Sequence, residues 1–255
     1  MRFQFGIFFL ILTSVFLSAC ATGKSSETQR VEAQPVAHQL SSREEKIAEF
    51  NKSVFCLSVV HTKLQDPKRR AMGTAFLVSD NLFATALHVK QDLDRQMNQS
   101  YRLPEQIMAW KKFEDGEYFE IPIKFVAADT ESDIALFSFQ AEGLKEIAQK
   151  RGIKPIQLAD RLPAIGEDIL SIGYYGLIES PFNSLGTVSN IEKGEDIYAD
   201  MTLMPGNSGG PLISMKTGEV IGINIKVMTI GDGTMRLGIS KKISKLRDLI
   251  KNNKN

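Results

Sequence analysis

The sequence predicts an all-β domain over residues 53–240, closed by one helix. Short runs rich in β-branched and aromatic side chains recur along this stretch, and clusters of Gly, Asp, Asn and Ser separate them. The same stretch has no apolar periodicity long enough for a core helix. Short strands at such regular spacing are typical of a β-sandwich or a β-barrel, and about 200 residues are enough to form a hydrophobic core.

The first half of this domain, about residues 53–140, is expected to contain six strands. Turn sequences such as Ser79-Asp80-Asn81 and Glu114-Asp115-Gly116 separate neighbouring strands. A short helical turn is expected after the third strand, at His88. The expected strands cover residues 54–62, 71–79, 82–86, 106–113, 118–127 and 133–139.

The second half, about residues 153–240, is expected to contain seven strands after a helical or irregular segment at 141–152. The turn Lys216-Thr217-Gly218 separates two of them. A final helix is expected at about 241–252, because Ile243, Leu246, Leu249 and Ile250 form one apolar stripe there. The expected strands cover residues 154–158, 168–174, 185–191, 197–202, 211–215, 220–227 and 234–239.

The first 19 residues are expected to be a signal peptide. Arg2 supplies a positive charge, and the apolar run at residues 5–17 is too short to cross a bilayer of about 30 Å comfortably. The run ends in Leu17-Ser18-Ala19-Cys20, which resembles a bacterial lipobox. That resemblance implies cleavage before Cys20, lipidation of Cys20 (palmitate included) and anchoring in the bacterial cell envelope. Ala21 favours the outer membrane, with the protein facing the periplasm. The alternative is a plain secretory signal that is cut after Ala19.

The segment between the lipobox and the folded domain is expected to be a tether. Residues 20–41 are polar, contain Pro35 and lack periodic apolar positions. Ser42-Arg43-Glu44-Glu45 has the pattern of a capping box and predicts a short helix to about Asn51. The folded domain is therefore expected to span residues 42–255. Cys56 lies in an apolar run and is expected to be a small buried side chain outside any disulfide.

Composition argues against several classes of function. The chain has 31 basic and 30 acidic side chains, a net charge of +1, so no overall field favours nucleic acid as a partner. Its three histidines are scattered and no His-Glu-x-x-His sequence occurs, so neither a metal nor another cofactor is expected.

The segment Gly206-Asn207-Ser208-Gly209-Gly210 predicts a nucleophilic serine. Glycines on both sides of Ser208 permit a tight turn and leave space for a substrate carbonyl. The backbone of Gly206, Asn207 and Ser208 is the expected oxyanion hole, in which the N–H groups of Gly206 and Ser208 converge and Asn207 sets the turn. A simple turn that joins two strands is the alternative.

A serine nucleophile needs a general base, and the base needs an orienting carboxylate. Of the three histidines, His38 lies in the expected tether and His61 at the end of the first strand, which leaves His88 as the expected base. Asp133 is the expected carboxylate, because an acid beside a continuous apolar run needs a partner that offsets its desolvation. The alternative acids are Asp129, Glu131 and Asp168.

These residues resemble one family. The sequences GTAFLV…ATALH, DIAL and PGNSGGPL occur in the order His, Asp, Ser, as in the trypsin-like peptidases, and they are most similar to the bacterial HtrA/Deg protease domain. The resemblance implies two chymotrypsin-like six-stranded β-barrels, with the triad His88, Asp133 and Ser208 in the cleft between them. Two departures are Leu87 before the histidine and Tyr174-Tyr175-Gly176 in place of an Asn-Pro pair. No PDZ domain is expected, since the sequence ends soon after the last strand.

The same resemblance places the substrate pocket at Thr202, six residues before the serine, and at Ile225 and Lys226 on the strand after Gly222. No acid or histidine stands at the pocket base, so a small or aliphatic P1 residue is expected. The sequence thus predicts a serine endopeptidase that acts through an acyl-enzyme on polypeptides of the envelope. The rival prediction is a catalytically silent lipoprotein of the same fold that binds peptides or an envelope partner.

Overall fold

The computed structural model describes residues 34–61, 72–99, 105–139, 142–176, 178–192, 196–231 and 235–253. The expected signal peptide, Cys20 and residues 20–33 of the expected tether lie outside these ranges. Within them, no helix is long and apolar enough to cross a membrane.

The first six strands form a closed antiparallel barrel, here barrel 1. Its strand order is β1-β2-β3-β6-β5-β4, so β3 and β6 are neighbours. Aromatic side chains fill the interior, among them Phe55 and Phe83, whose ring centroids are 4.9 Å apart. The strands are β1 (Val54–His61), β2 (Gly73–Ser79), β3 (Leu82–Ala86), β4 (Glu105–Lys112), β5 (Tyr118–Asp129) and β6 (Ile134–Phe139).

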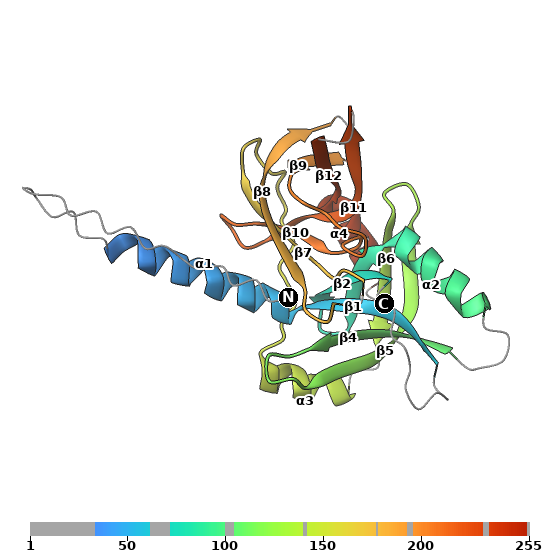
Figure 1. Cartoon of the computed structure of the whole chain (residues 1–255). Coiled ribbons are helices and arrows are strands. Elements are labelled where there is room, and N and C mark those ends of the chain that lie inside the picture. The colour runs from blue at the N-terminus through green and yellow to red at the C-terminus, as the bar shows by residue number, and fades with distance from the viewer. Residues whose placement is uncertain are drawn as a thin grey trace, which may run out of the picture.

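The last six strands form a second closed antiparallel barrel, barrel 2, in the order β10-β11-β12-β9-β8-β7. The two barrels lie side by side (Figure 1), so the predicted chymotrypsin-like double barrel is confirmed. The strands are β7 (Asp168–Gly173), β8 (Phe182–Ile191), β9 (Asp196–Asp200), β10 (Pro211–Ser214), β11 (Val220–Ile230) and β12 (Met235–Lys242).

The described residues also form four helices outside the barrels: α1 (Gln34–Lys52), α2 (Leu87–Gln99), α3 (Glu142–Arg151) and α4 (Ile243–Asn252). The predicted apolar stripe of the final helix is confirmed, since Ile243, Leu246 and Ile250 of α4 are buried. Cys56 is fully buried in β1, as predicted. Helix α1 extends away from the barrels (Figure 1).

Two helices differ from their predictions. Helix α1 begins at Gln34 and not at Ser42, so residues 34–41 are helical and are not a tether. Pro35 falls in its first turn, where a missing N–H costs no helical hydrogen bond. The expected short turn at His88 is the 13-residue helix α2. It persists because Val89 and Leu93, one turn apart, are both buried in the core.

Residues 154–158 were predicted to form a strand, and this was wrong, because they connect the two barrels. The N–H of Ile156 donates to the carbonyl of Leu77 in barrel 1. The N–H of Val220 in barrel 2 donates to the carbonyl of Gln157, and Leu158 makes only an isolated bridge to Val220. Backbone groups that alternate between two sheets extend neither of them.

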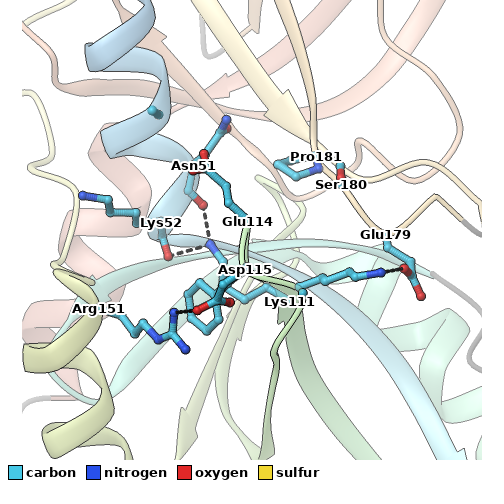
Figure 2. Close-up of a pocket in the computed structure, with 13 residues that line it drawn as sticks. Asn51, Lys52, Lys111, Glu114, Asp115, Arg151, Glu179, Ser180 and Pro181 are labelled. Atoms are coloured by element: carbon cyan, nitrogen blue, oxygen red, sulfur yellow. Dashed lines mark hydrogen bonds and ion pairs between the residues drawn. The ribbon is translucent and has the colours of Figure 1, made fainter.

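Lys111 lies buried beneath the C-terminal end of α1 (Figure 2). Its ammonium group donates to the backbone carbonyls of Asn51 and Lys52, at 2.6 and 2.8 Å. Carbonyls at a helix C-terminus lack helical partners and attract a cation. Burial, with a smaller effect of the charge on Lys52, lowers the pKa of Lys111 to about 7. The rings of Phe55 and Phe113 lie 5.1 and 5.5 Å from the same nitrogen.

Lys111→Met is expected to remove a pH dependence of stability. The folded pKa lies below the unfolded value of about 10.4, so above pH 7 the unfolded chain binds more protons and the free energy of unfolding rises with pH. Between pH 7 and pH 9 the wild type should gain about 2 kcal/mol over the variant, measured by urea denaturation. Lys112→Met, which removes a partly exposed ammonium paired with Glu179, is the control and should show no such gain. A difference between wild type and Lys111→Met that does not change with pH would contradict the lowered pKa.

A cavity of about 740 Å³ opens beside Lys111, between the end of α1, the turn after β4, Arg151 of α3 and residues 179–181 (Figure 2). Two ion pairs join charged side chains that line it. Arg151 pairs with Asp115, and Lys112 with Glu179. These pairs tie α3 and residues 179–181 to barrel 1.

Candidate active site

His88 and Asp133 meet because β3 and β6 are paired. His88 is the second residue of α2, directly after β3, and Asp133 stands one residue before β6. The last residue of β3, Ala86, pairs with Ile134. The carboxylate of Asp133 accepts the backbone N–H of His88 at 2.8 Å, and its second oxygen lies 2.6 Å from Nδ1 of the imidazole. The barrel thus holds the ring by two contacts to one carboxylate.

The carboxylate also determines which ring nitrogen is free. An ionised carboxylate only accepts hydrogen bonds, so Nδ1 carries the hydrogen and Nε2 keeps its lone pair. Asp133 has a backbone φ of 54°, a left-handed conformation that is uncommon for residues other than glycine although Asp tolerates it better than most. Its own carbonyl accepts the N–H of Leu87, at 2.9 Å. Asp129, an alternative acid, accepts the N–H of Ser132 and caps a turn.

Ser208 follows a tight turn from Met204 to Asn207. The N–H of Asn207 donates to the carbonyl of Met204 at 3.0 Å, and Pro205 and Gly206 are the central residues. Gly206 has a φ of 101°, and proline followed by such a glycine is typical of a type II turn. Asn207 is buried, and its side-chain oxygen accepts the N–H of Met204 at 3.2 Å. We call residues 204–208 the serine turn.

The backbone N–H groups of the serine turn are of two kinds. Asn207 was expected to set the turn and not to act as a donor, and its N–H donates to the carbonyl of Met204. The N–H groups of Gly206 and Ser208 donate to no protein group in the part of the chain that the structure describes. Asn207 therefore shapes the turn. Among the described residues, the N–H groups without a protein acceptor are those of Gly206 and Ser208.

The serine turn is seated on barrel 1. The N–H of Thr74 in β2 donates to the carbonyl of Ser208 at 2.9 Å. Gly209 lies against Thr85 and Ala86 of β3, the strand that leads to His88. The hydroxyl of Ser208 donates to the carbonyl of Ile225 at 3.0 Å, and no hydrogen bond joins it to His88 in the described residues.

A cavity of about 390 Å³ opens directly beside Ser208. Ile225 and Lys226, two of the three predicted pocket residues, line it, but Thr202 does not. Thr202 is exposed and its N–H donates to the hydroxyl of Ser184, whereas its neighbour Leu203 points inward. Thr202, six residues before the serine, therefore lies on the exposed side of a segment in which exposed and buried residues alternate. The lining comprises Leu203, Met204, Pro205, Asn207, Ser208, Asn224, Ile225, Lys226, Val227 and Thr229.

The described residues contain no group of three His, Cys, Asp or Glu side chains placed to hold a metal ion. Tyr174 and Thr74 were not predicted as site residues, yet both contact the serine turn. Tyr174 was noted in the sequence only as part of the departure Tyr174-Tyr175-Gly176. Thr74 lies within a strand and carries no sequence signal beyond its place in the GTAFLV motif.

Comparisons with known proteins agree with this geometry. A family model described as "Trypsin-like peptidase domain" matches residues 73–223. A probable periplasmic serine endoprotease DegP-like of Halomonas elongata is 28% identical over 188 residues, which cover 71% of this chain and 35% of that protein. A protein of the same description from Buchnera aphidicola is 28% identical over 201 residues, covering 75% and 37%. The chain spans about a third of the length of these curated relatives.

Solved structures show the same fold. The serine endoprotease from Yersinia pestis superposes with a TM-score of 0.58 at 20% identity, covering 82% of this chain and 65% of that one. Deg5 gives a TM-score of 0.59 at 20% identity, covering 82% and 93%. The family match spans more than half of the 255 residues, and the chain belongs to the trypsin-like peptidase domain family.

Proposed function

We propose that this chain is a serine endopeptidase in which Ser208 is the nucleophile, His88 the general base and Asp133 the residue that orients the base. The observation that carries the proposal is the pair of contacts from one carboxylate to the backbone and ring of His88. They leave Nε2 as the basic nitrogen, on the strand end against which the serine turn packs. Family membership supports the same assignment.

The reaction requires the Ser208 hydroxyl to turn from the carbonyl of Ile225 towards Nε2 of His88. The hydroxyl proton then passes to Nε2 while Oγ bonds to the substrate carbonyl carbon. The C–N bond of the peptide breaks, and the departing amine takes the proton from His88. Water, deprotonated by the same nitrogen, attacks the acyl ester. The bond between the acyl carbon and Oγ breaks, Oγ takes the proton back from His88, and the acid product and the free serine result.

The negative oxygen that forms in both steps needs preorganised donors. The N–H groups of Gly206 and Ser208 supply them in this proposal, since no protein group in the described chain accepts from either. The cavity beside Ser208 is the proposed P1 pocket. Its inner wall of Leu203, Ile225 and Val227 favours a small or aliphatic P1 side chain, and the exposed Lys226 is screened by solvent.

The cellular setting is inferred from two sources. Relatives of the chain are described as periplasmic serine endoproteases, and the lipobox at Cys20 predicts a lipid anchor. We infer that the protein acts on polypeptides of the bacterial envelope. Lipidation of Cys20 and the outer-membrane location stay predictions.

A second candidate function is peptide binding without cleavage. One observation favours it: the Ser208 hydroxyl donates to Ile225 and not to His88. A peptidase can also rest with its serine hydroxyl in this orientation, provided that the hydroxyl can turn to Nε2 of His88. Covalent reactivity of Ser208 therefore distinguishes the two candidates.

Peptidyl diphenyl phosphonates test the function and the P1 preference together. In these probes a serine oxygen displaces phenoxide from phosphorus, and the phosphoryl oxygen takes the place of the oxyanion. The full chain should be labelled by a probe with valine at P1 at least about 10-fold faster than by probes with lysine or glutamate. Mass spectrometry should place the adduct on Ser208, and Ser208→Ala should not react.

Labelling that persists in Ser208→Ala would assign the reactivity to another nucleophile. A wild type that reacts with none of the three probes would support the non-cleaving candidate. A faster reaction with the lysine or glutamate probe would overturn the aliphatic preference alone.

A further inference from the structure

We propose that Thr74 is a positioning residue for the reaction: its hydroxyl holds the carbonyl of Gly206 and thereby fixes the turn that carries the oxyanion donors. The inference rests on the proposed function and adds to it a residue of barrel 1 that does not touch the reacting atoms.

The hydroxyl of Thr74 bridges two backbone groups of barrel 2. It donates to the carbonyl of Gly206 at 2.7 Å and accepts the N–H of Tyr174 at 2.9 Å. An N–H can only donate, so the Tyr174 group occupies a lone pair of the hydroxyl and leaves its single hydrogen for Gly206. Thr74 and Tyr174 are both fully buried, so water does not compete for either bond.

The held carbonyl belongs to the Gly206–Asn207 peptide of the serine turn. This peptide lies between the Pro205–Gly206 peptide, which carries the Gly206 N–H, and the Asn207–Ser208 peptide, which carries the Ser208 N–H. Met204 holds its N–H end at 3.0 Å, and Thr74 holds its carbonyl end. Glycine rotates more freely about φ and ψ than other residues. Without the bond from Thr74, the plane of this peptide is fixed at one end only, and both neighbouring donors can leave the positions that the oxyanion needs.

Thr74 is itself rigidly held. Its N–H donates to the carbonyl of Ser208 at 2.9 Å, and its carbonyl accepts the hydroxyl of Thr85 at 2.7 Å. Tyr174, which fixes the direction of the hydroxyl, is anchored by its ring, 5.9 Å from that of Trp110. The two barrels therefore meet at the serine turn through Thr74, and a methyl group in place of its hydroxyl would remove the contact to the turn together with the acceptor of the Tyr174 N–H.

Thr74→Val and Thr74→Ser test the proposal, with the valine phosphonate as the probe. Valine keeps the shape of threonine and lacks the donor, so kinact should fall about 10- to 100-fold while KI stays within about two-fold. Serine keeps the donor and should restore kinact to within about three-fold of the wild type. Ser53→Ala is the matched control, because it also removes a buried hydroxyl that donates to a backbone carbonyl and accepts a backbone N–H, both of Lys154 in the segment between the barrels. It should lower the melting temperature comparably and leave kinact within about three-fold.

Hydrogen exchange at the Asn207 amide gives a second readout that needs no reaction. This N–H is held by Met204, and it should exchange at least about 10-fold faster in Thr74→Val but not in Thr74→Ser or Ser53→Ala. If Thr74→Val does not fold, Thr74→Ala replaces it in both measurements.

The outcomes separate this inference from the proposed function. If no phosphonate labels the wild type, the proposed function is wrong. The exchange rate of the Asn207 amide still shows in that case whether Thr74 holds the turn. A labelled wild type with an equally reactive Thr74→Val overturns the inference and leaves the proposed function standing. A Thr74→Ser variant as slow as Thr74→Val would also overturn it, because shape rather than the donor would then be responsible.

Discussion

Asp133→Asn is expected to lower kcat about 10⁴-fold and to leave the fold intact. The side-chain oxygen of the new amide must still accept the N–H of His88, which in the wild type lies 2.8 Å from one carboxylate oxygen. The amide nitrogen then faces Nδ1, where the second carboxylate oxygen stood at 2.6 Å. Because that nitrogen only donates, the imidazole has to place its own hydrogen on Nε2. The base then has no lone pair to offer Ser208.

The measurement is hydrolysis of a peptide ester or amide with valine at P1, with kcat and KM determined separately. KM should change little, because the cavity beside Ser208 does not include Asp133. Asp129→Asn is the control. Asp129 accepts the N–H of Ser132 and has no hydrogen bond to His88 among the described residues. The side-chain oxygen of asparagine can accept the same N–H, so this variant should keep the fold and leave kcat within about three-fold. An Asp133→Asn variant with wild-type kcat would remove Asp133 from the mechanism.

The strands and the serine turn could be predicted because their signals are local. A strand shows itself by its own β-branched and aromatic residues, and the serine turn by glycines that only a tight turn explains. His88 and Asp133 could be chosen because each is a polar residue directly beside an apolar strand. The two side chains meet because β3 and β6 are neighbours in barrel 1.

The features that were missed depend on contacts between distant segments. Residues 154–158 look like a strand by composition, but their backbone groups bond alternately to the two barrels. Thr202 and Leu203 differ by one residue, and only the packing of barrel 2 decides which of them points inward. Thr74 stands 132 residues from the carbonyl that it holds, and no pattern within β2 distinguishes its hydroxyl from that of any other strand threonine.

Gly209→Ala is expected to destabilise the fold by more than about 3 kcal/mol and to abolish labelling of Ser208. Two effects add. Gly209 has a φ of 85°, which costs an L-residue about 1–2 kcal/mol. A methyl group on it would also lie closer than 3.0 Å to the hydroxyl of Thr85, the carbonyl of Thr74 and the N–H of Ala86. Two of these three atoms belong to the backbone of barrel 1, so they can move only if the barrel moves.

Gly166→Ala separates the two effects. Gly166 has nearly the same φ, 81°, but a methyl group there would meet nothing within 4 Å. This variant should lose only the cost of the backbone conformation, about 1–2 kcal/mol by urea denaturation, and should keep its reaction with the valine phosphonate. Equal losses in the two variants would show that conformation alone is responsible and that barrel 1 yields at Gly209. A larger loss at Gly209, together with an unreactive Ser208, would show that the absence of a side chain there is what lets the serine turn reach the strand that carries the base.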